Sequence, residues 1–213
     1  MTPIAGRFQL LDAPRPGTPQ RARDLETAQT VLLRDVPLPR DAEPVLAHAR
    51  AARGIFHPSL VTLFDVFLLP GWRVLLAYEC LPSSQTIAQM TAGQPMNARH
   101  AASLVVEVAD AVAELHAHGV AHGGISQAAV VVTMKGKAKL DRIADPTLSS
   151  HAATTADDLV ALGELLADLA GRPGTTGGVV GAEAIEALVT RARAGKFDSA
   201  ATFAALLRRA SRA

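Results

Sequence analysis

The sequence predicts an α+β fold in which a small β-rich N-terminal lobe, residues 1–81, precedes a helical C-terminal lobe, residues 82–213. Two patterns support this prediction: short apolar runs bounded by turn residues dominate the first third of the chain, and apolar stripes of helical period dominate the rest. Hydrophobic residues make up 49% of the chain and charged residues 19%, so the chain can bury a full core and is not predicted to be disordered.

The N-terminal lobe is predicted to be a small sheet that carries one helix. Its strands lie at residues 8–11, 30–35, 60–68 and 72–81. The last two flank Pro70-Gly71, a turn signal, and therefore predict a β-hairpin. Prolines at positions 14, 16 and 19 exclude a helix or a central strand between residues 10 and 23. The helix is predicted at residues 41–54, where good helix formers precede the helix-stop residue Gly54.

Helices predominate in the C-terminal lobe. Their predicted ranges are residues 97–119, 156–170, 181–193 and 199–209. Asn97 and Ser199 are suitable N-terminal caps for the first and the last of them. A second hairpin is predicted at residues 130–133 and 137–140, with lysines 135, 137 and 139 on a solvated face. Residues 171–181 contain five glycines and a proline, which predicts a mobile loop.

Composition and charge argue against several classes of function. A net charge of +1 argues against a nucleic-acid binder, which needs a basic face. The longest apolar runs are far shorter than the ~18 residues that cross a bilayer, and no signal peptide is recognisable. The single cysteine, Cys80, excludes an intramolecular disulfide and a cysteine-based zinc site. We therefore expect a cytoplasmic protein that neither binds nucleic acid nor inserts into a membrane.

Five short segments occur in the same order and at similar spacing as motifs of protein kinases. They are FHPSLV at residues 56–61, LAYECL at 76–81, LHAHGVAH at 115–122, DLVALG at 158–163 and GRP at 171–173. In kinases the corresponding segments follow helix αC, form the hinge, lead into the catalytic loop, and begin and end helix F. The chain therefore resembles the serine/threonine protein-kinase superfamily over residues 7–207. This resemblance implies a two-lobed protein kinase-like fold.

The resemblance also implies that the residues for phosphoryl transfer are missing. A kinase needs a strand lysine paired with a helix glutamate, a catalytic-loop aspartate, lysine and asparagine, and a metal-binding aspartate. The corresponding positions are Arg34, His48, Gly124, Ser126, Ala129 and Arg142. Residues 12–19 replace the glycine-rich phosphate loop with a proline-rich segment that has few N–H donors. We therefore expect a degenerate bacterial pseudokinase with no catalytic residues, no metal site and no cofactor.

Further positions of the resemblance surround the nucleotide pocket. Leu32 replaces the small alanine that faces adenine in kinases, so we expect Leu32 to fill the pocket. Tyr78, Glu79 and Leu81 are the expected hinge residues. Asp141 precedes the metal-position residue, and strand alternation predicts that its side chain points to the other face.

Two positions are expected to be structural. His122 matches a member of the apolar spine of kinases, and Asp158 matches the helix F aspartate that accepts backbone N–H groups of the catalytic loop. The activation segment is expected to be short, at residues 145–155, and the αG region is expected to be reduced to residues 171–181. The pattern HxHx₃H at residues 116–122 could ligate zinc only with a fourth ligand, and the kinase resemblance explains two of its histidines.

The function expected from the resemblance and the lost residues is that of a pseudokinase scaffold or regulator that does not bind ATP–Mg²⁺ appreciably. Its partner would be another protein or a second copy of the chain. Two alternatives remain open at this stage. The first is a pseudokinase that binds ATP as a structural ligand. The second is a kinase-fold transferase with an atypical metal site, for which Asp141, Asp145 and Glu43 are the available carboxylates.

Overall fold

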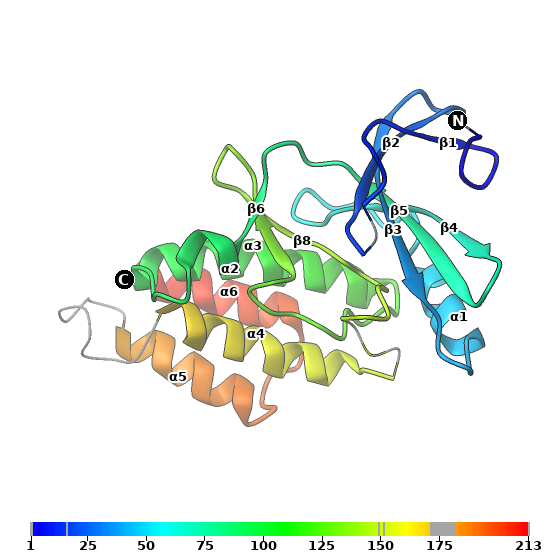
Figure 1. Cartoon of the computed structure of the whole chain (residues 1–213). Coiled ribbons are helices and arrows are strands. Elements are labelled where there is room, and N and C mark those ends of the chain that lie inside the picture. Colours follow the sequence, from blue (N-terminus) through cyan, green and yellow to red (C-terminus); the bar gives the residue numbers. More distant parts are fainter. Residues whose placement is uncertain (1, 16, 149, 151, 171–181, 213) are drawn as a thin grey trace.

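The computed structural model describes the chain except residues 1, 16, 149, 151, 171–181 and 213. A five-stranded antiparallel sheet with helix α1 forms one end of the molecule, here called the sheet part. Helices α2–α6 and a three-stranded sheet form the other end, the helical part (Figure 1). The mixed α+β class predicted from the sequence is confirmed.

The sheet part contains one strand that the sequence analysis excluded. Its strands are β1 (Phe8–Leu10), β2 (Gln20–Asp24), β3 (Thr30–Pro37), β4 (Leu63–Leu69) and β5 (Arg73–Glu79), in the order β1-β2-β3-β5-β4. Strand β2 pairs with both β1 and β3, so the exclusion of a central strand before residue 23 was wrong. The reason is that the last proline, Pro19, precedes Gln20, and the strand itself contains no residue without an N–H donor.

The two faces of the five-stranded sheet have separate cores. Helix α1 (Glu43–Ala52) buries Val45, Leu46, Ala49 and Ala52 in the main core. On the other face Phe8 and Phe67 meet edge to face, with ring centroids 5.3 Å apart. The Arg7 guanidinium lies over both rings and forms a salt bridge of 2.7 Å with the buried carboxylate of Asp24. These contacts hold the first strand against the rest of the sheet.

The helical part is built around its longest helix. Its helices are α2 (Ile87–Thr91), α3 (Ala98–Ala117), α4 (Thr155–Ala170), α5 (Ala182–Arg193) and α6 (Ala200–Ala210). The predicted caps are confirmed, because Asn97 accepts a hydrogen bond from the Arg99 N–H and Ser199 accepts one from the Thr202 N–H. Helix α2 was not predicted, because five residues are too few for a periodic stripe. The loop predicted at residues 171–181 lies outside the described residues.

A three-stranded sheet joins the two parts. Its strands are β6 (Gln85–Thr86), β7 (Val130–Val132) and β8 (Ala138–Leu140), in that order. Leu140 in β8 bonds through its backbone to two residues that precede β4: its N–H donates to Ser59 and its carbonyl accepts from Val61, both at 2.8 Å. The helical part is therefore tied directly to the sheet part. None of the helices in the described part of the chain is both long enough and apolar enough to cross a membrane.

Candidate functional site

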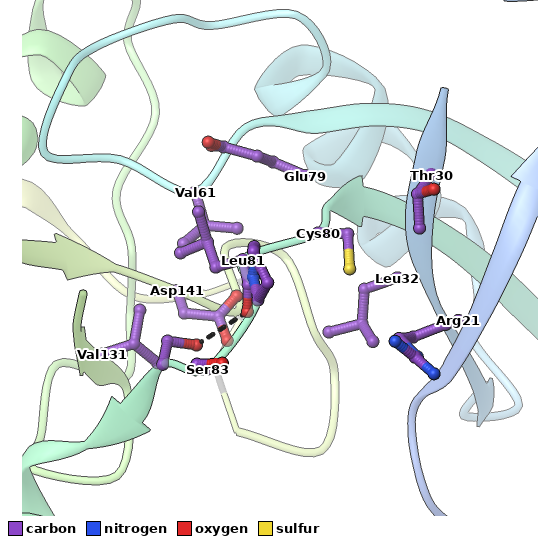
Figure 2. Close-up of a pocket in the computed structure, with 12 residues that line it drawn as sticks. Arg21, Thr30, Leu32, Val61, Glu79, Cys80, Leu81, Ser83, Val131 and Asp141 are labelled. Carbon is purple, nitrogen blue, oxygen red and sulfur yellow. Dashed lines mark hydrogen bonds between the residues drawn. The ribbon is translucent and has the colours of Figure 1, made fainter. Parts of the chain in front are cut away.

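A pocket of about 530 Å³ opens between the five-stranded sheet on one side and strand β7 with Asp141, the residue after β8, on the other. Figure 2 shows Leu32 and Arg21 on one side and Val61 and Val131 on the opposite side, with Cys80 near Leu32. The side chain of Leu32 is partly buried and forms part of the wall. Leu32 therefore lines an open pocket without closing it, and the expectation that it occupies the adenine volume stays a prediction.

The predicted hinge residues divide into two groups. Glu79 and Leu81 line the pocket. Tyr78 is fully buried outside the pocket lining, and its hydroxyl donates a 2.7 Å hydrogen bond to the Ile143 carbonyl. Burial raises the pKa of Tyr78 well above its usual value, so the phenol remains a proton donor in that bond. Tyr78 therefore links β5 to the segment that follows β8.

Lys139 is buried rather than solvated, and it forms an ion pair with the carboxylate of Glu79. Its Nζ atom lies 2.8 Å and 2.7 Å from the two carboxylate oxygens of Glu79. The Thr62 N–H also donates to Glu79, at 3.3 Å. Figure 2 shows the Glu79 carboxylate pointing away from Leu32 and Cys80. Lys135 and Lys137 are exposed as predicted, whereas Lys139 is buried because its ammonium group pairs with Glu79 at the end of β5.

Asp141 faces the pocket, contrary to the orientation predicted from strand alternation. Its carboxylate lies 3.4 Å from the Arg34 guanidinium and also accepts the Arg142 N–H at 2.7 Å. Alternation fails here because β8 ends at Leu140 and Arg142 adopts a left-handed conformation with φ 68°. Arg34 thus forms an ion pair with Asp141.

The other positions singled out by the resemblance have different partners. The guanidinium of Arg142 donates to the Asp145 carboxylate at 2.9 Å and to the Thr147 hydroxyl at 2.8 Å. His48 lines a second pocket of about 640 Å³ between α1 and the segment that follows β8. Ala129 is fully buried, and its N–H donates to the Ser126 carbonyl at 3.0 Å.

Asp158 makes the contacts predicted for it. It is 1% exposed and accepts hydrogen bonds from the backbone N–H groups of His122, at 2.7 Å, and Gly123, at 2.8 Å. The His116 Nε2 atom lies 2.9 Å from the same carboxylate. His122 is also buried, and its Nε2 atom hydrogen-bonds to the Asp141 carbonyl at 2.9 Å. Burial lowers the pKa of His122, which therefore favours the neutral imidazole.

Leu148, Ser150 and Ala153 pack directly on the loop at Gly123 and Gly124. A Cβ atom added to Gly124 would lie 2.8 Å from the Leu148 carbonyl oxygen, and one added to Gly123 would lie 2.6 Å from the Ser150 carbonyl oxygen. The Ser150 N–H donates to the Gly123 carbonyl at 3.2 Å. Because backbone atoms occupy the space, neither position has room for a side chain unless these residues move.

The carboxylates considered for an atypical metal site do not converge. Glu43 forms an exposed pair with Arg50, Asp141 faces Arg34, and Asp145 bonds to Arg142. Within the described ranges, no group of three or more histidine, cysteine, aspartate or glutamate side chains is arranged to hold a metal ion. The three histidines at residues 116–122 also diverge, because His116 and His122 make separate contacts and His118 is exposed.

Sequence reasoning missed three features of this site: the place of Asp141, the burial of Lys139, and the backbone of Leu148 against Gly124. Each depends on a tertiary contact between segments that no local pattern reports. The adjacent pair Gly123-Gly124 was the only sequence signal, since two glycines permit a close approach of backbone. Neither models of known protein families nor curated proteins give a match to this chain, so the site is interpreted from its own geometry.

Proposed function

We propose that this chain is a catalytically inactive protein kinase-like protein, a pseudokinase, that acts by binding another protein. In this proposal the sheet part is an N-terminal lobe, residues 1–81, and the helical part is a C-terminal lobe, residues 82–213. The order of elements supports it: a five-stranded antiparallel sheet with one helix between β3 and β4 is followed by a mainly helical region. The pocket at the junction lies where the resemblance places a nucleotide.

The packing of Leu148 on Gly124 is the observation that carries the inactive assignment. A general base must come within about 2.6–3.2 Å of the group from which it takes a proton. Position 124, where the resemblance places that base, has no side chain, and its space is occupied by backbone. Arg142, at the expected metal position, is a cation already bonded to Asp145. The geometry therefore supports a structural rather than a catalytic role for the loop at Gly124.

Restoring the aspartate tests this assignment. We expect Gly124→Asp to gain no phosphoryl-transfer activity and to lower the melting temperature, because its side chain would collide with the Leu148 carbonyl. Ala128→Asp is the matched control: Ala128 lies exposed in the same loop and should keep the melting temperature of the parent. Transfer of labelled γ-phosphate from ATP to casein is the activity readout. Activity in the parent or in Gly124→Asp would contradict the proposal.

A nucleotide-binding pseudokinase is the second candidate, and the open pocket of about 530 Å³ favours it. Against it, the pair between Arg34 and Asp141 already neutralises the cation expected to contact phosphates. Ligand that binds only the folded state stabilises it by RT ln(1 + [L]/Kd), so a thermal-shift titration separates the two. We expect no rise in melting temperature with millimolar ATP and Mg²⁺. A metal-dependent rise would favour the second candidate.

Exposed apolar side chains on one hairpin support the protein-binding role. Leu68 at the end of β4 is 63% exposed, and Trp72 in the following turn is 64% exposed. Large exposed apolar groups that lie near one another are common at interaction sites. If this hairpin is used, Leu68→Glu together with Trp72→Glu should abolish recovery of a partner or a second copy without changing the melting temperature. Unchanged recovery would exclude this surface.

A further inference from the structure

The lining surface of the pocket between the two parts is mainly apolar. Leu32, Val61, Leu81 and Val131 supply the hydrophobic lining, and the volume of about 530 Å³ is typical of small-molecule sites. Thr30 and Ser83 are polar residues of the same lining (Figure 2). Ser84 contributes less, because its hydroxyl donates to the Leu81 carbonyl at 3.1 Å. A ligand would therefore meet mainly apolar surface and a few polar groups.

Every carboxylate and guanidinium in the pocket lining already has a partner of opposite charge. Asp141 faces Arg34 at 3.4 Å, and Glu79 faces Lys139 at 2.7 Å. Arg21 forms a pair of 2.8 Å with Asp12. A charged ligand that contacts Asp141 or Glu79 would have to break a largely buried ion pair or lose its own hydration without compensation, whereas the Arg21–Asp12 pair is more than half exposed and contributes little. An uncharged ligand avoids both costs.

We infer that this pocket is a binding site for an uncharged, largely apolar small molecule. This inference is independent of the proposed protein-binding function, because it rests on the lining and charge pairing of the pocket alone. It also differs from nucleotide binding, in which three phosphates would need unpaired cations or a metal ion. The expected ligand has a flat or branched apolar body that contacts Leu32 and Val131, and at most a few neutral polar groups near Thr30 and Ser83.

Cys80 provides a built-in reporter, because it lines the pocket and is the only cysteine of the chain. Burial raises the pKa of its thiol, so its alkylation by N-ethylmaleimide should be slow and easily timed by intact-protein mass spectrometry. The probe is 2-naphthol, which is uncharged at neutral pH, and its matched anion is 2-naphthalenesulfonate. At about twice the Kd of 2-naphthol, alkylation should slow about threefold, while the sulfonate at the same concentration should leave the rate unchanged.

Two variants that fill the pocket and one control variant test whether 2-naphthol binds in this pocket. Val131→Trp and Leu32→Phe should each remove protection by 2-naphthol. Val132→Trp, on the neighbouring strand position outside the lining, should retain it. Circular dichroism shows which variants fold, and one folded filling variant is enough for the test. The inference is overturned if 2-naphthol gives no protection, if the sulfonate protects equally, or if a folded filling variant keeps full protection. Protection by ATP with Mg²⁺ at a lower concentration than 2-naphthol would also overturn it.

Discussion

Asp158 is a buried carboxylate whose two oxygens are shared among three hydrogen-bonding groups, from His116, His122 and Gly123. Burying a carboxylate is costly unless its oxygens accept hydrogen bonds. Here two of the donors are backbone N–H groups of the loop. The same bonds hold the loop at the position where Leu148 and Ser150 pack on it. A single side chain therefore determines the local shape of the proposed degenerate catalytic loop.

We predict that Asp158→Ala lowers the free energy of unfolding by about 1–3 kcal/mol, because it leaves buried N–H groups without acceptors. Urea denaturation followed by circular dichroism measures the change. Asp168→Ala is the matched control, since Asp168 lies exposed on the same helix, α4. Equal stability of the two variants would show that the bonds of Asp158 contribute nothing.

The burial of His122 should make the stability of the protein depend on pH. Burial lowers its pKa in the folded state, whereas the unfolded chain takes up a proton below about 6.5. The unfolded state then binds more protons, so stability falls as the pH falls through that value toward the folded pKa. Melting temperatures from pH ~7 to pH ~5 should therefore decline, and His122→Gln should show a shallower decline. The exposed His100→Gln control should keep the slope of the parent, and equal slopes in both variants would contradict the assignment to His122.

At the scale of elements, the sequence predicted the long helices well because their periodic stripes are redundant. The stripe of α4 comprises Leu159, Leu162, Leu165, Leu166 and Leu169, and all five are buried. Strand β2 and helix α2 were missed, because β2 follows a cluster of prolines and α2 has five residues. The site was less predictable still, since the orientation of Asp141 depends on the backbone turn at Arg142.

The crossing of α4 and α5 depends on one glycine. Gly163 is buried on α4, and a Cβ atom added to it would lie 2.5 Å from the Cβ atom of Ala192 on α5. The absence of a side chain at Gly163 therefore allows the two helices to approach closely. Helix propensity alone would favour alanine at this position by about 1 kcal/mol, whereas overpacking typically costs about 1–3 kcal/mol.

We predict that the clash outweighs the gain in helix propensity and that Gly163→Ala is destabilising. Adding Ala192→Gly should recover part of the loss, because it removes the atom that the new methyl group meets. A double-mutant cycle of unfolding free energies measures this coupling. An increase in stability for Gly163→Ala alone would indicate that the helices separate without cost.

At the scale of the whole molecule, both parts contribute residues to the main core. The main cluster of buried apolar residues contains members from α1 in the sheet part and from α3, α4, α5 and α6 in the helical part. The backbone bonds of Leu140 and the hydrogen bond from Tyr78 to the Ile143 carbonyl add direct links across the junction. These shared contacts and bonds join the two parts at the junction.

We therefore predict that the sheet part and the helical part unfold in a single cooperative transition. Tyr78, the only tyrosine, is buried in β5, so its absorbance reports the sheet part, while far-UV circular dichroism reports mainly the helices. The two probes should give the same midpoint in urea, the signature of a two-state transition. In Tyr78→Phe the Ile143 carbonyl loses the hydroxyl that donates to it. The free energy of unfolding measured by circular dichroism should therefore fall by about 1–3 kcal/mol. A tyrosine transition that precedes the loss of helix would show that the junction yields first and that the shared core does not couple the two parts.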